Sequence, residues 1–222
     1  MRIIIEFDGV VFDVAAAWYA AHAAAAQAVG WSRLDQPTFW RLVRTKGREA
    51  DILPAAKPVK LTDYWTKFDA LLETDATIAS FVPHDGIART LLTLAGHGGL
   101  MLVTLGGNLP ARRGLLERAG LARFFPQFQR LDADPRRRPA ELRTLAGGDP
   151  RTLVAAGSDD IIRSTGGADL LAVGVSCGPC NAARLHQAGA GLVHKNLSEL
   201  ADSLDSGGHD LVRAGLLPRS LG

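Results

Sequence analysis

Five short apolar runs, separated by segments of helical character, restrict the fold more than any other feature of the chain. They occupy residues 3–7, 99–104, 152–156, 170–175 and 191–194. The runs are continuous rather than alternating, which is typical of strands that helices cover on both faces. The strand, helix, strand order therefore predicts an α/β fold with a doubly wound parallel sheet.

The strand pattern is interrupted between residues 14 and 81, where one helical segment follows another. All four tryptophans fall in this stretch, which indicates a small core of its own: Trp18, Trp31, Trp40 and Trp65. The sequence "FVPHDG" at residues 81–86 supplies the proline and glycine expected where the chain returns to the sheet. We therefore expect a core domain of residues 1–13 and 82–222 and a helical cap domain of residues 14–81.

Charge and hydropathy exclude several classes of partner. The 25 basic and 23 acidic residues leave a net charge of +2, so the chain has no general basic field for nucleic acid. No stretch approaches the roughly 18 apolar residues that a membrane helix needs. Glu6 and Asp8 stand where a signal peptide would be apolar. We expect a cytoplasmic protein without a nucleic-acid or membrane partner.

Carboxylates crowd the end of the first predicted strand, in "RIIIEFDGVVFD" at residues 2–13. Glu6, Asp8 and Asp13 lie within eight residues around one glycine. Such acids repel one another unless a cation or a proton lies among them, which indicates a metal site or an acid/base pair. A polar loop with a helix N-cap at Asp13 explains the same spacing. Ligands of parallel sheets bind at this end of the strands.

Nearly the whole chain resembles the haloacid dehalogenase (HAD) superfamily. The resemblance rests on "IIIEFDGVVFD", the helical insertion, "PHDGIARTLLTLAGHGGLMLVTLGGN" and the later strand and glycine pattern. It is strongest with the phosphoglycolate-phosphatase-like branch that carries a helical cap. The resemblance implies a Rossmann-like core and a Mg²⁺-dependent phosphatase that acts on a small phosphorylated molecule.

The first motif of this family departs from its usual form here. The resemblance places Glu6 where the family has its nucleophilic aspartate, makes Asp8 the acid/base, and gives Gly9 the tight turn. Glu6 is also a candidate metal ligand, and the backbone carbonyl of Asp8 would join the metal shell. One extra methylene displaces the carboxylate of Glu6 by roughly 1.5 Å. A misplacement of about 1 Å can cost on the order of a hundredfold in rate.

The second and third motifs supply the expected phosphate contacts. Thr104 matches the hydroxyl that holds a phosphoryl oxygen, with help from backbone amides that include Gly106. Arg138, with Arg137 as the alternative, stands where the family usually has lysine, and arginine is not a neutral replacement. Without the resemblance, a threonine at a glycine turn and a solvated arginine run explain the same residues.

The fourth motif is also altered, because Ser158 stands in the place of its first aspartate. Either Asp159 or Asp160 then supplies the second metal carboxylate, or only part of the shell remains. A helix N-cap explains these aspartates equally simply. In the helical insertion, Arg44 and Arg48 resemble a loop that grips the anionic leaving group, and a basic helix face ending at a glycine is the alternative.

The sequence "SCGPC" at residues 176–180 suggests a rival function as a thiol redox protein. Cys177 and Cys180 have the spacing of a thioredoxin pair, after a strand and before a helix, where a thiolate would be stabilised. The proline that faces such a pair is missing, because no proline lies between Cys180 and Pro218. Redox chemistry is therefore a minor alternative.

Three of the four motifs are altered at a chemical position. A Mg²⁺-dependent phosphatase that uses Glu6, Asp8, Thr104 and Arg138 is the first hypothesis. The second is a catalytically inactive HAD-fold protein that binds a phosphorylated ligand or a protein partner.

Overall fold

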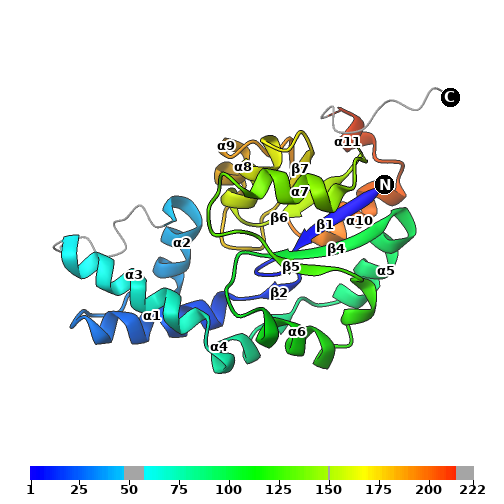
Figure 1. Cartoon of the computed structure of the whole chain (residues 1–222). Coiled ribbons are helices and arrows are strands. Elements are labelled where there is room, and N and C mark those ends of the chain that lie inside the picture. The colour runs from blue at the N-terminus through cyan, green and yellow to red at the C-terminus, as the bar shows by residue number, and fades with distance from the viewer. Residues whose placement is uncertain (48–57, 150, 214–222) are drawn as a thin grey trace.

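A six-stranded parallel sheet forms the centre of the computed structural model, which describes residues 1–47, 58–149 and 151–213. The strand order is β5-β4-β1-β6-β7-β8 (Figure 1). The strands are β1 (Arg2–Glu6), β4 (Gly99–Thr104), β5 (Phe128–Arg130), β6 (Leu153–Ala156), β7 (Leu171–Val175) and β8 (Leu192–His194). The predicted α/β fold with a doubly wound parallel sheet is confirmed.

All five predicted strands are present, and the described residues contain three further short strands that the sequence did not predict. Edge strand β5 has three residues, which is too short for a recognisable pattern. The other two, β2 (Phe12–Asp13) and β3 (Val82–Pro83), pair antiparallel in a separate two-stranded sheet. Phe12 faces Pro83, so the chain leaves and re-enters the core at neighbouring points.

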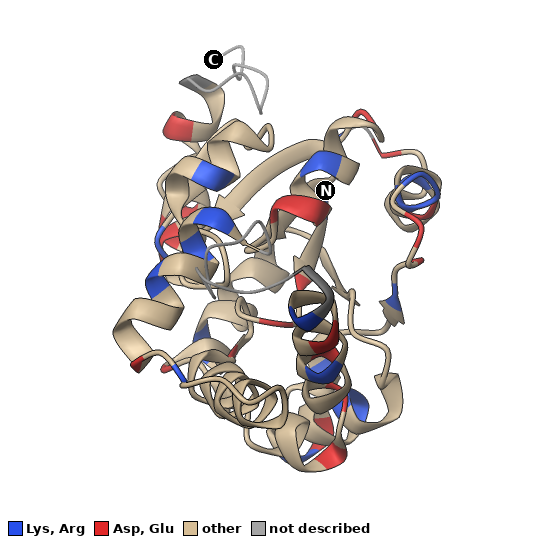
Figure 2. Ribbon diagram, turned by 90° about the vertical axis from the view of Figure 1, so that its left-hand side faces the viewer, with Lys and Arg blue, Asp and Glu red and all other residues tan. Residues whose placement is uncertain are grey.

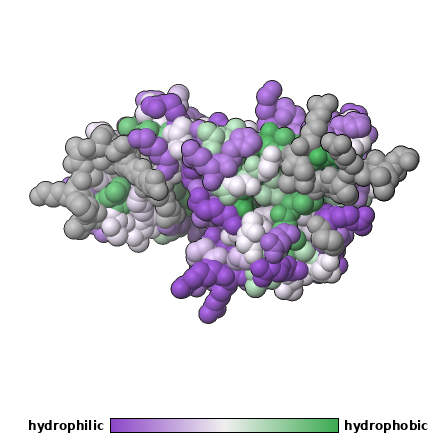
Figure 3. Space-filling model, turned by 90° about the horizontal axis from the view of Figure 1, so that it is seen from above, coloured by the Kyte–Doolittle hydropathy of each residue, from purple (hydrophilic) through white to green (hydrophobic). Residues whose placement is uncertain are grey.

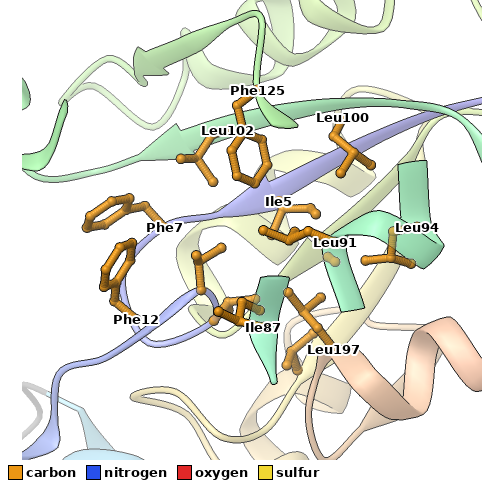
Figure 4. Packing of buried hydrophobic residues seen from close by; sticks show 14 of the residues in the cluster. Ile5, Phe7, Phe12, Ile87, Leu91, Leu94, Leu100, Leu102, Phe125 and Leu197 are labelled. Atoms are coloured by element: carbon orange, nitrogen blue, oxygen red, sulfur yellow. The ribbon is translucent and has the colours of Figure 1, made fainter. Parts of the chain in front are cut away.

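Helices cover both faces of the sheet. On one face lie α5 (Ile87–His97), α6 (Leu109–Arg118) and α10 (Leu197–Asp205), and on the other α7 (Arg138–Ala146), α8 (Asp159–Gly166) and α9 (Ala182–Gln187). Because side chains alternate along a strand, Ile5 packs with the first group and Ile4 with the second. Figure 4 shows Ile5 beside Leu91 of α5. A short η1 (Ala122–Phe124) and a terminal α11 (His209–Arg213) complete the core.

In the described residues between β2 and β3, four helices form what we call the helical segment. They are α1 (Ala15–Ala28), α2 (Gln36–Lys46), α3 (Pro58–Leu72) and α4 (Asp75–Ala79). Their shared cluster includes Phe39, Tyr64 and Phe68, and the segment lies to one side of the sheet (Figure 1). The helical pattern of residues 62–81 is interrupted between α3 and α4, where the Thr74 side chain caps α4. The division into two domains stays a prediction.

A buried histidine, His22, lies in the core of the helical segment. Its Nε2 accepts a hydrogen bond from the Leu34 amide at 3.0 Å, so the neutral ring carries its proton on Nδ1 and donates to Tyr64 Oη at 2.8 Å. The ring also stacks on Phe39, with centroids 4.3 Å apart. Burial lowers the pKa of His22 to about 4.

This histidine makes stability depend on pH. When the pH falls below 6.5, the ordinary pKa of histidine, His22 binds a proton in the unfolded state. In the folded state the pKa of His22 is about 4, so the ring stays neutral at that pH. We expect the free energy of unfolding to fall by about 2 kcal/mol between about pH 7 and about pH 5 from this group alone. Urea unfolding should show that His22→Gln loses this part of the pH dependence. The exposed His209 gives the control His209→Gln, which should keep it; equal slopes in native protein and His22→Gln would contradict the assignment.

Charges of both signs are spread over the surface. On the side seen in Figure 2, basic and acidic residues are interleaved along the helices rather than gathered on faces of one sign. Among the described residues, no helix combines the length and the apolar character that crossing a membrane requires.

Candidate functional site

A cavity of about 1060 Å³ opens at the carboxyl ends of the central strands and reaches the helical segment. We call it the site cavity. Its walls include Glu6 at the end of β1, Asp8 in the following loop, the loop 105–107 after β4, and the start of α8. Trp18 and Phe68 line it from the helical segment. Seen from above in Figure 3, hydrophilic side chains gather along the boundary between the helical segment and the sheet.

Glu6, at the end of β1, is bound by the loop between β6 and α8. Its residue is 3% exposed, and its Oε2 accepts hydrogen bonds from the amides of Gly157 at 2.8 Å and Ser158 at 2.9 Å. Burial raises the pKa of Glu6 to about 8, and the charge of Asp8 adds to this, while the two amides oppose it. The carboxyl group is therefore directed to the loop that follows β6.

Asp8 lies two residues further on and is engaged at both oxygens. Its Oδ1 lies 3.1 Å from Arg112 Nε, and its Oδ2 accepts a hydrogen bond from the Thr104 hydroxyl. Thr104 Oγ1 in turn accepts from the Gly106 amide at 2.9 Å. Thr104 is fully buried and is not part of the cavity wall, whereas Gly106 is. The hydroxyl predicted to hold phosphate thus holds Asp8 in this arrangement.

Arg112 is the main site residue that the sequence reading missed. It lies in α6 and is 3% exposed, and its guanidinium contacts Glu73 Oε2 at 2.8 Å and Oε1 at 3.2 Å as well as Asp8. Burial acts to raise the pKa of Glu73, but the hydrogen bonds and charge of Arg112 outweigh it and lower that pKa. The sequence could have indicated that Arg112 is buried, because Leu115 and Leu116 follow it at the i+3 and i+4 spacing of a buried helix face.

Arg138 lies on the cavity wall at the start of α7, as the third motif predicts. Its Nε donates to the Asp132 carbonyl at 2.8 Å and its Nη2 to the Ala133 carbonyl at 3.0 Å. Its Nη1 is buried without a hydrogen-bond partner among the described residues, and lies 3.9 Å from Asp160 Oδ1. The side chain is therefore fixed in place while one donor group stays unused.

Asp159 and Asp160 both line the cavity from the first turn of α8. The N-cap position belongs to Ser158, so neither aspartate is the cap. Asp159 Oδ2 lies 2.7 Å from Arg184 Nη2 and 2.7 Å from Arg163 Nη2. Burial acts to raise the pKa of Asp159, but these two arginines outweigh it and lower the pKa.

The metal-binding roles expected for these carboxylates stay predictions. Among residues 1–47, 58–149 and 151–213, no three His, Cys, Asp or Glu side chains come close enough to hold a metal ion. The oxygens of Asp8 and Asp159 are occupied by arginine and hydroxyl donors, and Glu6 binds backbone amides. Mg²⁺ is usually held by one or two carboxylates and keeps several waters, so the predicted ligand set needs no cluster of three side chains.

The predicted substrate contacts have different outcomes. Arg44 donates from Nη2 to the Ser176 carbonyl and is not part of the cavity wall, so it joins α2 to the core. Arg48 lies outside the described residues. Gly9 has a φ of 79°, which confirms the tight turn. The ligand-binding roles of these residues stay predictions.

The two cysteines are both free and lie against the site loops. Cys177 Sγ donates to the Gly9 carbonyl at 3.2 Å, and Cys180 Sγ lies 3.6 Å from Asp159 Oδ1. Burial raises the pKa of the Cys177 thiol to about 11 and that of Cys180 to about 12. A redox thiol needs the opposite shift, so these surroundings do not support the redox alternative.

Several solved structures match almost the whole chain in fold. A haloacid dehalogenase-like hydrolase from Streptococcus pneumoniae superposes with a TM-score of 0.73 at 10% identity, over 91% of this chain and 97% of that one. The chain has the haloacid dehalogenase fold. A predicted phosphatase from Clostridium acetobutylicum shares this fold, with a TM-score of 0.69 and 15% identity over 92% of this chain and 98% of that one.

A predicted phosphoglycolate phosphatase from Haemophilus somnus 129pt also has the haloacid dehalogenase fold, with a TM-score of 0.67 and 14% identity over 91% of this chain and 97% of that one. No protein-family model matches the sequence, and neither does any curated protein. The resemblance inferred from the motifs is therefore confirmed at the level of the fold.

Proposed function

We propose that the chain binds a small molecule carrying a phosphate group in the site cavity, with the helical segment serving as its cap. The observation that carries this proposal is Arg138. Its guanidinium is buried at the cavity wall and fixed by two carbonyl groups, and its Nη1 has no hydrogen-bond partner among the described residues. A phosphate oxygen would satisfy that donor through a charge-assisted hydrogen bond.

Two further observations support an anionic ligand. Arg130 also lines the cavity and forms no ion pair with any part of the chain that the structure describes. Asp159 is shared between Arg163 and Arg184, so one carboxylate faces two cations. The volume of about 1060 Å³ is at the upper end of the usual range for small-molecule sites. A metabolite-sized phosphate ester fits both the charge and the size.

Mg²⁺-dependent hydrolysis of such an ester is the second candidate. It would use Glu6 as the nucleophile and Asp8 as the acid/base. The observation in its favour is that Asp8 lies at the cavity beside the Thr104 hydroxyl. It ranks second because Glu6 would have to leave the amides of Gly157 and Ser158 before it could attack phosphorus.

Calorimetric titration with phosphoglycolate and with inorganic phosphate tests the binding proposal. We expect Arg138→Gln to weaken binding by about tenfold or more, since a hydrogen bond to a charged group contributes about 1.5–3 kcal/mol. Arg138→Lys, which keeps the charge, should lose less. The control is Arg136→Gln, because the Arg136 side chain is 88% exposed and pairs with Asp134 away from the cavity.

Two results would oppose the binding proposal: no heat of binding from either probe, or equal losses in Arg136→Gln and Arg138→Gln. Phosphate release from a panel of esters with Mg²⁺ then separates binding from hydrolysis. Release by the native protein that Asp8→Asn abolishes would establish the second candidate. Release by Glu6→Asp alone would show that the longer side chain prevents the chemistry.

A further inference from the structure

The site cavity has two walls of different chemistry. Among the described residues, all the arginines that line it come from the sheet and the helices that cover it: Arg112, Arg130, Arg138, Arg163 and Arg184. The helices of the helical segment contribute large apolar side chains to the same cavity: Trp18, Val43, Trp65, Phe68 and Leu72. A ligand that spans the cavity therefore meets cations at one end and hydrocarbon at the other.

Helix α3 directs one of its faces into the cavity. Four of its residues line the cavity at the i, i+3, i+4 and i+7 spacing of a single helix face: Trp65, Phe68, Asp69 and Leu72. Phe68 is 2% exposed, whereas Trp65 and Leu72 are half-buried. The face thus buries its central ring and leaves part of the flanking apolar side chains open.

Three aromatic rings of this wall hold one another in place. The Phe68 ring meets the Trp65 ring edge-on, with centroids 5.5 Å apart, and meets the Trp18 ring edge-on at 5.7 Å. Trp18 is half-buried like Trp65, so each keeps part of its indole surface uncovered. Because neighbouring rings already fix these indoles, they bind a planar apolar group with little further loss of side-chain freedom.

The charged groups on this side of the cavity do not favour a second anion. Among the described residues of the helical segment, Lys46, Asp69 and Glu73 line the cavity. Arg112 pairs with Glu73 at 2.8 Å. The other two, Lys46 and Asp69, have opposite charges, so this wall offers no net positive charge. The part of a ligand that faces it is therefore expected to be uncharged.

We propose that the phosphorylated ligand of the site cavity carries an uncharged aromatic group, which packs against Trp18 and Trp65. This inference rests on the proposed function, because Arg138 is the group that holds the phosphate end. It narrows the ligand from any small phosphate ester to an aryl or arylalkyl ester. Selectivity arises because the ring covers indole surface that water otherwise contacts. The two tryptophans are then specificity-determining residues.

Calorimetric titration with two phosphonates that differ by one phenyl ring tests this inference. Methylphosphonate and benzylphosphonate carry the same anionic group, and neither has an ester bond to hydrolyse. We expect benzylphosphonate to bind the native protein at least about fivefold more tightly, because its ring is partly buried against the indoles. A smaller advantage would overturn the inference.

Substitutions of tryptophan assign this advantage to the cavity wall. Trp65→Ala should reduce the ratio of the two affinities to less than about half its native value, and Trp65→Phe, which keeps a ring, should reduce it less. The matched control is Trp31→Ala, because Trp31 is also half-buried in the helical segment but is not part of the cavity wall. Equal ratios in Trp65→Ala and Trp31→Ala would overturn the inference.

Inorganic phosphate separates a failure of this inference from a failure of the proposed function. Binding of inorganic phosphate without the expected advantage for benzylphosphonate would refute the inference alone. Absence of binding by inorganic phosphate and by both phosphonates would refute the proposed function and the inference with it. Benzylphosphonate binding that Arg138→Gln does not weaken would also refute both, because the ring would then bind without the phosphate contact.

If Trp65→Ala does not fold, by circular dichroism, the native protein still decides. The heat-capacity change of binding becomes more negative when apolar surface is buried. Benzylphosphonate should therefore give a more negative value than methylphosphonate, and equal values would overturn the inference.

Discussion

Replacing Arg112 with methionine is expected to lower the free energy of unfolding by about 3–5 kcal/mol, the usual cost of removing one partner from a buried ion pair. Arg112 is 3% exposed and joins two carboxylates, Asp8 and Glu73. Its loss leaves both of them without their cation in a region that water reaches poorly. Urea unfolding followed by circular dichroism measures the change.

Arg118→Met is the matched control for this substitution. Arg118 lies in the same helix α6, but it is exposed. A surface substitution of this kind usually changes stability by less than about 0.5 kcal/mol. A cost for Arg112→Met as small as that for Arg118→Met would mean that the buried pair contributes nothing to the fold.

Gly9→Ala is expected to be the other strongly destabilising change. Gly9 has a φ of 79°, and an added Cβ would lie 2.8 Å from Pro179 Cδ and 2.9 Å from Gly178 Cα. The left-handed conformation costs about 1–2 kcal/mol for a residue with a side chain. Overpacking adds about 1–3 kcal/mol, because the obstructing Gly178 atom belongs to the backbone.

Gly86→Ala separates these two costs. Gly86 has a φ of 69°, but an added Cβ there meets no atom within 4 Å. It should therefore show the conformational cost alone. The difference between the two variants in urea unfolding measures how tightly the loop after β1 packs on the 177–180 turn, and no difference would contradict this close packing.

The sheet could be predicted from the sequence because its strands are buried on both faces. A continuous apolar run such as 99–104 has few alternatives once helical segments flank it. Strand β5 and the β2–β3 pair could not be predicted, since two or three residues carry no periodicity. The break between α3 and α4 was missed because the helical pattern continues across it.

The site was predictable in its location and less so in its contacts. Five residues that the motifs single out all line one cavity: Glu6, Asp8, Arg138, Asp159 and Asp160. They did not show that Glu6 would bind the amides of the β6 loop, because that contact depends on a backbone 151 residues away. Arg112 was missed for a similar reason: its partners Asp8 and Glu73 lie far from it in the sequence.

The pairing of β2 with β3 has a mechanical consequence for the helical segment. Phe12 lies opposite Pro83 and Asp13 opposite Val82, so both connections to the core run side by side. The two connections therefore leave the core at one place. Any displacement of the segment from the sheet would have to break the Arg112 contact with Glu73, the Arg184 contact with Val43 and the Arg44 contact with Ser176.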